Sequence, residues 1–86
     1  MLIDVRQPDE FAAPTGRLPG PLNIPLAELA ERTPDLARRQ QPIVVVCETD
    51  HHSARAAAEL LAAGLQDVAV LRGGTDGWRQ RGLALE

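Results

Sequence analysis

The single cysteine of the chain, Cys47, stands where a strand, a short loop and a helix are expected to meet. An apolar run at 42–46 precedes it, a polar stretch at 48–52 follows it, and an alanine-rich helical pattern begins at Ser53. Loop amides and the positive end of a helix can stabilise a thiolate, which is the nucleophilic form of cysteine. The position therefore indicates a nucleophile, with a small, inert, buried cysteine at a strand end as the alternative interpretation.

The polar neighbours of Cys47 raise the question of a metal site. His51 and His52 follow the cysteine, and each is as readily a solvated loop residue as a catalytic group. Neighbouring histidines rarely point at one ion, and no second cysteine or spaced histidine completes a tetrahedral set. The sequence therefore predicts no metal, and it predicts no cofactor, because Gly73-Gly74 lacks the glycine spacing of a dinucleotide-binding loop.

Length and composition limit the possible classes of protein. Eighty-six residues predict a single domain over 1–86, and one cysteine excludes an internal disulfide framework. The net charge of −3 gives no electrostatic reason to expect nucleic-acid binding. No apolar stretch is long enough to cross a membrane and no signal peptide precedes the first strand pattern, so we expect no membrane partner and a cytoplasmic location.

The hydrophobic pattern alternates between strands and helices. The predicted strands cover 2–5, 22–24, 43–47 and 68–71. The predicted helices cover 26–32, 36–39, 53–63 and 75–81. Residues 6–21 are rich in proline and glycine and predict a loop, while Pro34 is expected to interrupt the first helical pattern. In the helix at 53–63, Ser53 is the expected N-cap, and the expected apolar side consists of Ala54, Ala57, Ala58, Leu60 and Leu61.

This alternation predicts an α/β fold with a parallel sheet and helices on both of its faces. In such sheets the reactive site lies beyond the carboxyl ends of the strands. Three predicted strands end at polar or glycine-rich segments, namely at Asp4-Val5-Arg6, at Cys47 and at Arg72-Gly73-Gly74. We therefore expect these three segments to meet at one crevice.

Four segments resemble the signatures of the rhodanese-like sulfurtransferase domain family, in the family's order and spacing. Asp4-Val5-Arg6 with Glu10-Phe11 is similar to the first signature, and residues 16–25 are similar to its Gly-His-Ile-Pro-Gly-Ala-x-Asn-Ile-Pro segment. Cys47 and Ser53 match the catalytic loop, and residues 73–78 resemble the Gly-Gly-x-x-x-Trp signature. The resemblance implies a three-layer α/β/α fold with a mostly parallel central sheet, here lacking the usual N-terminal strand and helix.

The resemblance also implies sulfur transfer through a persulfide of Cys47. A small-molecule donor such as thiosulfate would supply the sulfane sulfur, and a thiol or cyanide would accept it. Asp4 and Arg6 would support the loop as scaffold residues. The backbone N–H groups of 48–52 would hold the outer sulfur, within an active-site loop made of Glu48, Thr49, Asp50, His51, His52 and Ser53.

This loop departs from the family pattern in its charge. Thiosulfate-using members usually carry an arginine five residues after the cysteine, where this chain has His52. Asp50 replaces a frequent loop glycine, and Glu48 adds a second carboxylate. Thiosulfate is a dianion, so we expect this loop to hold it poorly. A phosphatase-type Cys-x5-Arg loop is disfavoured as well, because Ser53 stands where the arginine would be required.

Two functions therefore remain open. One is a single-domain sulfurtransferase, which the retained Cys47 favours. The other is a catalytically weak or inactive module that serves protein binding or regulation, which the changes at Asp50 and His52 favour. A missing edge strand would expose the backbone of its neighbour, so a homodimer or an attached domain is also expected as a partner.

Overall fold

A four-stranded parallel sheet organises the chain, and the computed structural model describes residues 1–12, 18, 20–48 and 50–83. The strands lie in the order β2-β1-β3-β4, and every neighbouring pair is parallel. Their bounds are β1 (Leu2–Asp4), β2 (Leu22–Asn23), β3 (Ile43–Val46) and β4 (Val68–Val70). The predicted α/β class with a parallel sheet is confirmed.

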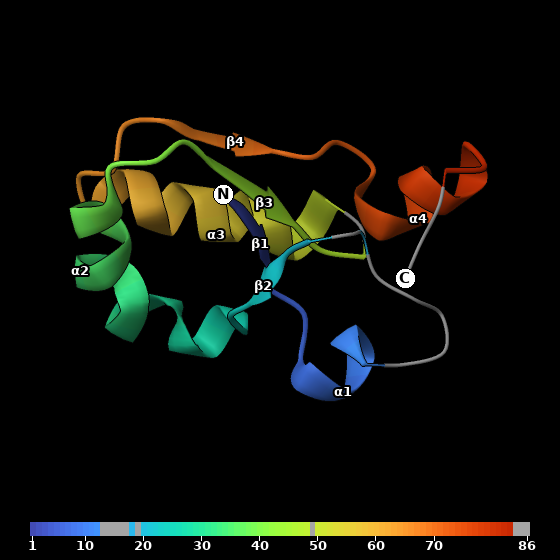
Figure 1. The fold of residues 1–86 in the computed structure, drawn as a ribbon, viewed down its shortest axis with the longest axis horizontal. Coiled ribbons are helices and arrows are strands. Elements are labelled where there is room, and N and C mark those ends of the chain that lie inside the picture. Colours follow the sequence, from blue (N-terminus) through green and yellow to red (C-terminus); the bar gives the residue numbers. More distant parts are fainter. Residues whose placement is uncertain (13–17, 19, 49, 84–86) are drawn as a thin grey trace.

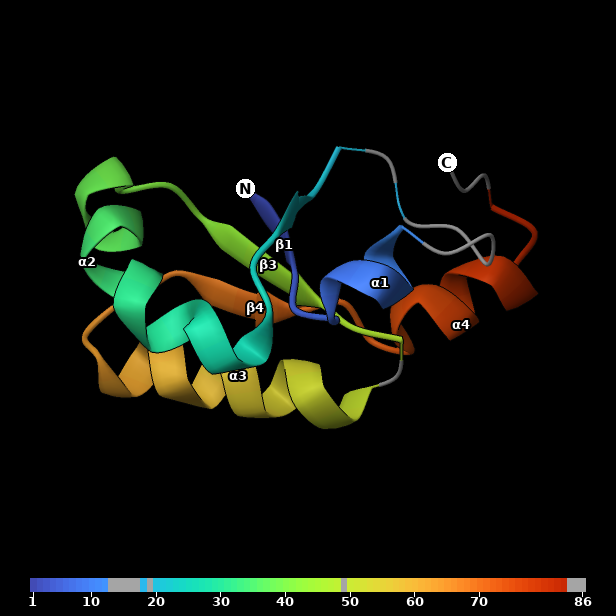
Figure 2. The same ribbon diagram turned by 90° about the horizontal axis from the view of Figure 1, so that it is seen from below.

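The helices lie in two groups around this sheet. The longer ones, α2 (Leu29–Arg39) and α3 (Asp50–Ala62), cover one face of the sheet (Figures 1 and 2). The shorter ones, α1 (Pro8–Phe11) and α4 (Gly74–Gln80), lie beyond the carboxyl ends of the strands. A 3-10 helix, η1 (Leu26–Glu28), leads into α2. Helical turns therefore surround the end of the sheet at which Cys47 stands.

The main core lies between the sheet and the pair α2 and α3. Because side chains alternate along a strand, Ile3 on β1 and Val45 on β3 point to the same face and are fully buried. The remaining buried members of this cluster are Val5, Ile24, Leu29, Leu36, Ile43, Cys47, Ala56 and Leu60. Cys47, the candidate nucleophile, thus belongs to the core cluster, at the carboxyl end of β3.

Helix α3 begins earlier than the sequence pattern predicts. It starts at Asp50, so Ser53 lies inside the helix and the prediction that Ser53 caps it is wrong. The buried side of α3 consists of Ser53, Ala56, Ala57 and Leu60. Ala54 and Leu61 are exposed, so the buried side of the helix is rotated about its axis relative to the predicted apolar side. Alanine occurs on nearly every side of this helix, which leaves the hydrophobic period ambiguous.

One further prediction for the first half of the chain is wrong, and the prediction of a loop or broken turns over 6–21 is refined. Helix α2 continues through Pro34, although proline removes a backbone hydrogen bond to the preceding turn. Burial of Leu29 and Leu36 on either side of Pro34 holds the helix against the sheet, so packing outweighs the local preference. The segment predicted as loop at 6–21 contains α1, which starts with Pro8 at its first position. Residues 13–17 and 19 of that segment lie outside the described residues.

The second face of the sheet carries an apolar hollow. It has a volume of about 480 Å³, and its lining comprises Met1, Leu2, Leu18, Val44, Leu71 and Trp78. Trp78 is half-buried there rather than enclosed in the main core. Within the described part of the chain, β4 has one strand neighbour and forms an edge of the sheet. The homodimer expected from an open edge stays a prediction. No helix in that part is long and apolar enough to cross a membrane.

A buried ion pair joins Asp4 and Arg6 at the end of β1. The Arg6 side chain donates to the Asp4 carboxylate at 2.9–3.1 Å, and the backbone N–H of Arg6 donates to the same carboxylate at 3.0 Å. Both side chains are at most 1% exposed. The Asn23 amide donates to the carbonyl oxygens of Asp4 and Arg6, which ties β2 to this turn. The pair therefore fixes the path of the chain where β1 ends.

The start of α4 is docked onto the backbone that carries Cys47. The N–H of Thr75 donates to the carbonyl oxygen of Cys47 at 2.8 Å, and that of Asp76 donates to the carbonyl of Glu48 at 3.0 Å. Gly74 directly precedes Thr75 and has a φ of +59°. A Cβ on this residue would clash with the carbonyl oxygen of Cys47. Glycine is required at this position both for its conformation and for the close approach.

Replacing Gly74 with alanine should destabilise the fold more than a glycine replacement without a clash. We expect Gly74→Ala to lower the free energy of unfolding by at least about 3 kcal/mol. Gly82→Ala is the matched control, since Gly82 has a φ of +73° but nothing within 4 Å of a built Cβ. It should cost about 1–2 kcal/mol. Urea unfolding measures both, and equal losses would contradict the close approach.

Removing the charge of Asp4 should leave the Arg6 guanidinium buried without its counter-ion. We expect Asp4→Asn to lower the free energy of unfolding by about 3–5 kcal/mol. The control is Asp35→Asn, whose ion pairs with Arg38 and Arg39 at 3.5 and 3.6 Å are exposed. That change should stay within about 1 kcal/mol. A similar urea midpoint for both variants would show that the buried pair is dispensable.

Candidate active site

Cys47 follows β3 directly, at the carboxyl end of a central strand. The residue is 4% exposed, and its sulfur lies at the margin of the main core. Its carbonyl oxygen and that of Glu48 are both held by N–H groups of α4. The backbone that carries the thiol is therefore held by β3 before it and by the start of α4 beside it.

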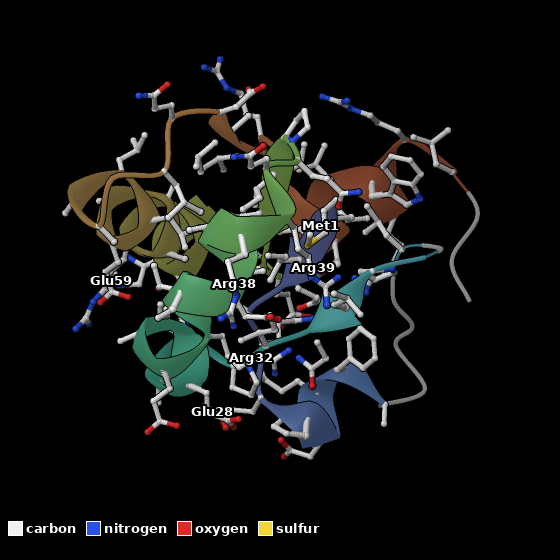
Figure 3. All side chains as sticks on the ribbon, turned by 60° about the vertical axis from the view of Figure 1, so that its left-hand side comes forward. Met1, Glu28, Arg32, Arg38, Arg39 and Glu59 are labelled. Atoms are coloured by element: carbon white, nitrogen blue, oxygen red, sulfur yellow. The ribbon has the colours of Figure 1, made fainter. Side chains whose placement is uncertain are left out.

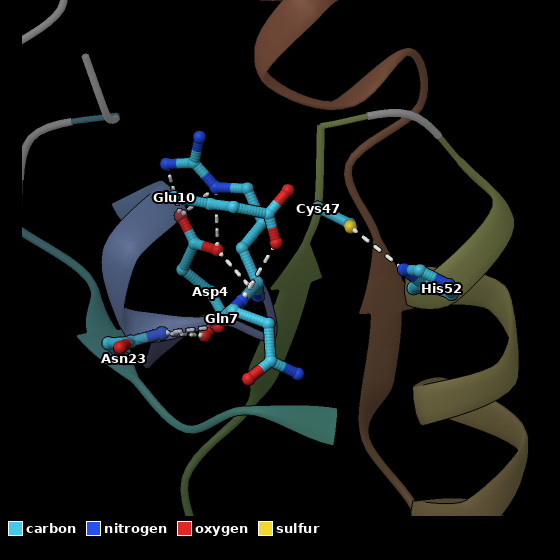
Figure 4. A network of polar contacts seen from close by, with 7 residues as sticks. Asp4, Gln7, Glu10, Asn23, Cys47 and His52 are labelled. Carbon is cyan, nitrogen blue, oxygen red and sulfur yellow. Dashed lines mark hydrogen bonds and ion pairs between the residues drawn. The ribbon is translucent and has the colours of Figure 1, made fainter. Parts of the chain in front are cut away.

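The side chain of His52 lies beside the thiol of Cys47. Its Nδ1 lies 3.7 Å from the sulfur of Cys47, and the ring comes from the first turn of α3 (Figure 4). The imidazole is exposed on its other side, so it can exchange protons with solvent. A protonated ring at this distance favours the thiolate over the neutral thiol. Of the two interpretations of His52, its location supports a role in the site.

The earlier start of α3 changes the predicted active-site loop. Asp50, His51, His52 and Ser53 belong to the helix, so Glu48 is the one described residue of the predicted loop that lies outside it. Thr49 and the side chain of Asp50 lie outside the described residues. The first N–H groups of a helix have no acceptor within it, so those of the first turn point outward from its start. The predicted cradle of N–H groups over 48–52 stays a prediction.

The other predicted residues take different positions. His51 is exposed, with its ring centroid 5.2 Å from that of His52. Ser53 is fully buried on the side of α3 that faces the sheet. Asp4 and Arg6 are buried at the end of the adjacent strand, where they support the turn, and Figure 4 shows Asp4 there. The structure therefore brings Cys47 and His52 together.

Beside this pair lies a hollow of about 340 Å³ between α1, η1 and α3. His52 lines it, and so do Arg55 and Glu59 from the same side of α3. The sequence pattern did not identify Glu59 as part of this hollow. With the helix starting at Asp50, the spacing of three and four residues between these side chains would have placed them on one side.

The two other hollows lie away from the cysteine. One, of about 400 Å³, is lined at the amino ends of β3 and β4 by residues such as Pro42, Ile43 and Asp67. The other is the apolar hollow on the second sheet face. Among the described residues there is no group of three or more histidine, cysteine, aspartate or glutamate side chains that could hold a metal ion. The chemistry of the described residues is concentrated around Cys47.

Comparison with known proteins agrees with this geometry. The sequence model of the Rhodanese-like domain matches residues 1–81. The chain is 38% identical over 77 residues to YqhL of Bacillus subtilis (strain 168), covering 90% of this chain and 59% of that protein. It is 35% identical over 81 residues to thiosulfate sulfurtransferase GlpE of Pseudomonas syringae pv. syringae (strain B728a), covering 92% of this chain and 72% of GlpE.

A solved structure extends the likeness to three dimensions. The thiosulfate sulfurtransferase of Pseudomonas aeruginosa superposes with a TM-score of 0.86 at 37% identity, over 99% of this chain and 16% of that one. The matching residues include the strand ends and the turn that hold Cys47. The chain belongs to the rhodanese-like domain family.

Proposed function

We propose that this protein is a sulfurtransferase that carries a sulfane sulfur as a persulfide of Cys47. The observation that carries the proposal is the contact between Cys47 and His52, at 3.7 Å, at the carboxyl end of β3. A cysteine, a base and a helix start are the parts that nucleophilic catalysis by a thiolate requires. The family relatives named as thiosulfate sulfurtransferases support the same class of reaction.

The reaction proceeds in two displacement steps. The thiolate of Cys47 attacks the sulfane sulfur of the donor, a new S–S bond forms, and the bond between that sulfur and the rest of the donor breaks. With thiosulfate the leaving group is sulfite, and with a persulfide donor it is a thiolate. An acceptor thiolate or cyanide then attacks the outer sulfur, and Cys47 leaves as the thiolate. No net redox change occurs at the protein, so no cofactor is required.

The residues around Cys47 have distinct tasks in this scheme. A protonated His52 offsets the negative charge of the thiolate and of the persulfide. The free N–H groups at the start of α3 would hold the outer sulfur of the persulfide. Asp4 and Arg6 position the adjacent turn through their own buried pair.

The donor preference follows from the charge of the site. A second cation next to the thiol would favour a dianion such as thiosulfate, but the position that usually supplies it holds His52. Glu48 adds a carboxylate directly after the cysteine. We therefore propose that thiosulfate is a poor donor and that a less charged persulfide is a better one.

A second candidate function is a binding or regulatory module without turnover. The observation in its favour is the burial of Cys47, which is 4% exposed and leaves little room for a donor to approach. The two functions differ in one measurable property, which is whether Cys47 gains sulfur.

Exposure to sulfane-sulfur donors should add the mass of one sulfur atom to the intact protein. Thiosulfate, 3-mercaptopyruvate and glutathione persulfide are tested side by side by mass spectrometry. The added mass should be absent from Cys47→Ser and should be removed by cyanide. If a folded protein gains no sulfur from any donor, the sulfurtransferase proposal fails and the binding module takes its place.

Replacing His52 with arginine should improve the use of thiosulfate. A guanidinium holds a charge at every pH of the assay and can bind an anion through two parallel hydrogen bonds, so we expect kcat/KM for thiosulfate to rise about tenfold. His51→Arg is the matched control, because it adds the same charge on an exposed neighbour whose contact with the sulfur is not seen. Equal thiosulfate turnover by the wild type and His52→Arg would refute the proposed donor preference.

A further inference from the structure

Cys47 is enclosed in this structure, and its backbone is fixed from the side of α4. The residue is 4% exposed and belongs to the main core cluster. The N–H groups of Thr75 and Asp76 bind the carbonyl oxygens of Cys47 and Glu48. A displacement at sulfur requires contact between the donor and the thiolate. The segment that fixes this backbone is therefore a candidate for a moving part.

Thr75, at the start of α4, carries a polar group without a partner. Its side chain is fully buried, and among the described residues its hydroxyl finds no hydrogen-bond partner. Such a hydroxyl loses its bonds to water on folding and gains none in return, so it raises the free energy of the arrangement seen here. It would recover water if α4 moved away from the end of the sheet. The penalty at Thr75 therefore favours an opening of α4.

Helix α4 is also a weak helix by composition. Its seven residues include Gly74 and Gly77, and glycine disfavours a helix because it loses the most backbone freedom. The ion pair of Asp76 with Arg79, at 2.9 Å, lies within the helix and does not attach it to the sheet. The helix therefore depends on its docking to keep its place.

The aromatic anchor of α4 packs against an open surface. Trp78, the only tryptophan of the chain, is half-buried and lines the apolar hollow of about 480 Å³ on the second sheet face. A side chain next to such a hollow makes fewer dispersion contacts than one enclosed in a core. Trp78 therefore holds α4 less firmly than a fully buried side chain would.

The connection between β4 and α4 provides a hinge. Gly73 and Gly74 have φ values of +85° and +59°. Glycine adopts positive and negative φ with similar ease, so two successive glycines can redirect the chain at little cost. Residues that absorb such backbone changes at the base of a moving element are typical hinge residues.

From these observations we propose that α4 is a hinged clamp, which opens at Gly73-Gly74 and thereby makes the thiol of Cys47 accessible. In the closed form, the first N–H groups of α4 hold the carbonyl oxygens of Cys47 and Glu48. In the open form, these groups and the hydroxyl of Thr75 bind water, and the released end of β3 turns the sulfur toward solvent. The inference goes beyond the proposed function, since it concerns access to Cys47 and not the reaction that follows.

Amide hydrogen exchange of the wild-type protein measures the opening. The N–H of Asp76 is bonded across the clamp, whereas the N–H of Val5 is bonded to the carbonyl of Val46 at 3.0 Å, within the sheet. We expect the protection factor of Asp76 to be at least about tenfold below that of Val5, because the clamp opens without global unfolding. Equal protection of the two amides would overturn the proposal.

Thr75→Val tests the role of the unpartnered hydroxyl. Valine keeps the branched shape of threonine and removes the polar group, so the closed form gains stability relative to the open one. We expect the protection factor of Asp76 to rise about tenfold, and alkylation of Cys47 by iodoacetamide to slow by the same factor. An unchanged protection factor would overturn the proposal. So would slower exchange with unchanged alkylation, because the sulfur would then be reached without the clamp.

Thr33→Val is the matched control. Thr33 lies on α2 beside Arg32, which Figure 3 labels, and its hydroxyl donates to the carbonyl oxygen of Leu29 at 2.9 Å. The same replacement of atoms there acts on another helix and on a hydroxyl that has a partner. We expect it to leave the protection of Asp76 and the alkylation of Cys47 unchanged. If it slows alkylation as much as Thr75→Val does, the clamp is not the cause and the proposal fails.

Both measurements are independent of sulfur transfer. Alkylation rates are compared at a pH where the thiol is fully ionised, so that they report access to Cys47 and not its pKa. A failure of the clamp would leave a positive persulfidation result intact. Conversely, a protein that gains no sulfur from any donor would still show the opening in exchange and in alkylation.

Discussion

The position of Cys47 depends on two backbone hydrogen bonds at the start of α4. The N–H groups of Thr75 and Asp76 hold the carbonyl oxygens of Cys47 and Glu48, and they reach these oxygens only because Gly74 has no side chain. A parallel sheet brings the ends of β3 and β4 to the same edge, which makes this contact possible. Cys47 and Glu48 are therefore held by the start of α4 as well as by β3, the strand that precedes them.

The charges near the site are divided between support and reaction. Asp4 and Arg6 neutralise each other in the interior, where their value lies in fixing a turn rather than in net stability. His52, Arg55 and Glu59 are on the exposed side of α3, in contact with solvent. Spatial separation of these two sets lets a small domain carry a polar site without leaving its scaffold charges unpaired.

Sequence patterns predicted much of this arrangement and missed a specific part of it. The four strands and the place of Cys47 were predictable, because apolar runs of strand length ended at polar or glycine-rich segments. The start of α3 was not, because its alanines give no clear period and Ser53 resembles a cap. That error hid the alignment of His52, Arg55 and Glu59 on one side of the helix. The continuation of α2 through Pro34 depends on packing against the sheet, which local preference does not report.

The low exposure of Cys47 has a consequence for its chemical survival. Thiolates oxidise to sulfenic and then sulfinic acid when peroxides reach them, and the later stages are irreversible. A cysteine that is 4% exposed and has His52 beside its sulfur meets few such molecules. The enclosure that would restrict the approach of a donor therefore also protects the thiol. The packing at the end of β3 thus determines how long the thiol survives under oxidising stress.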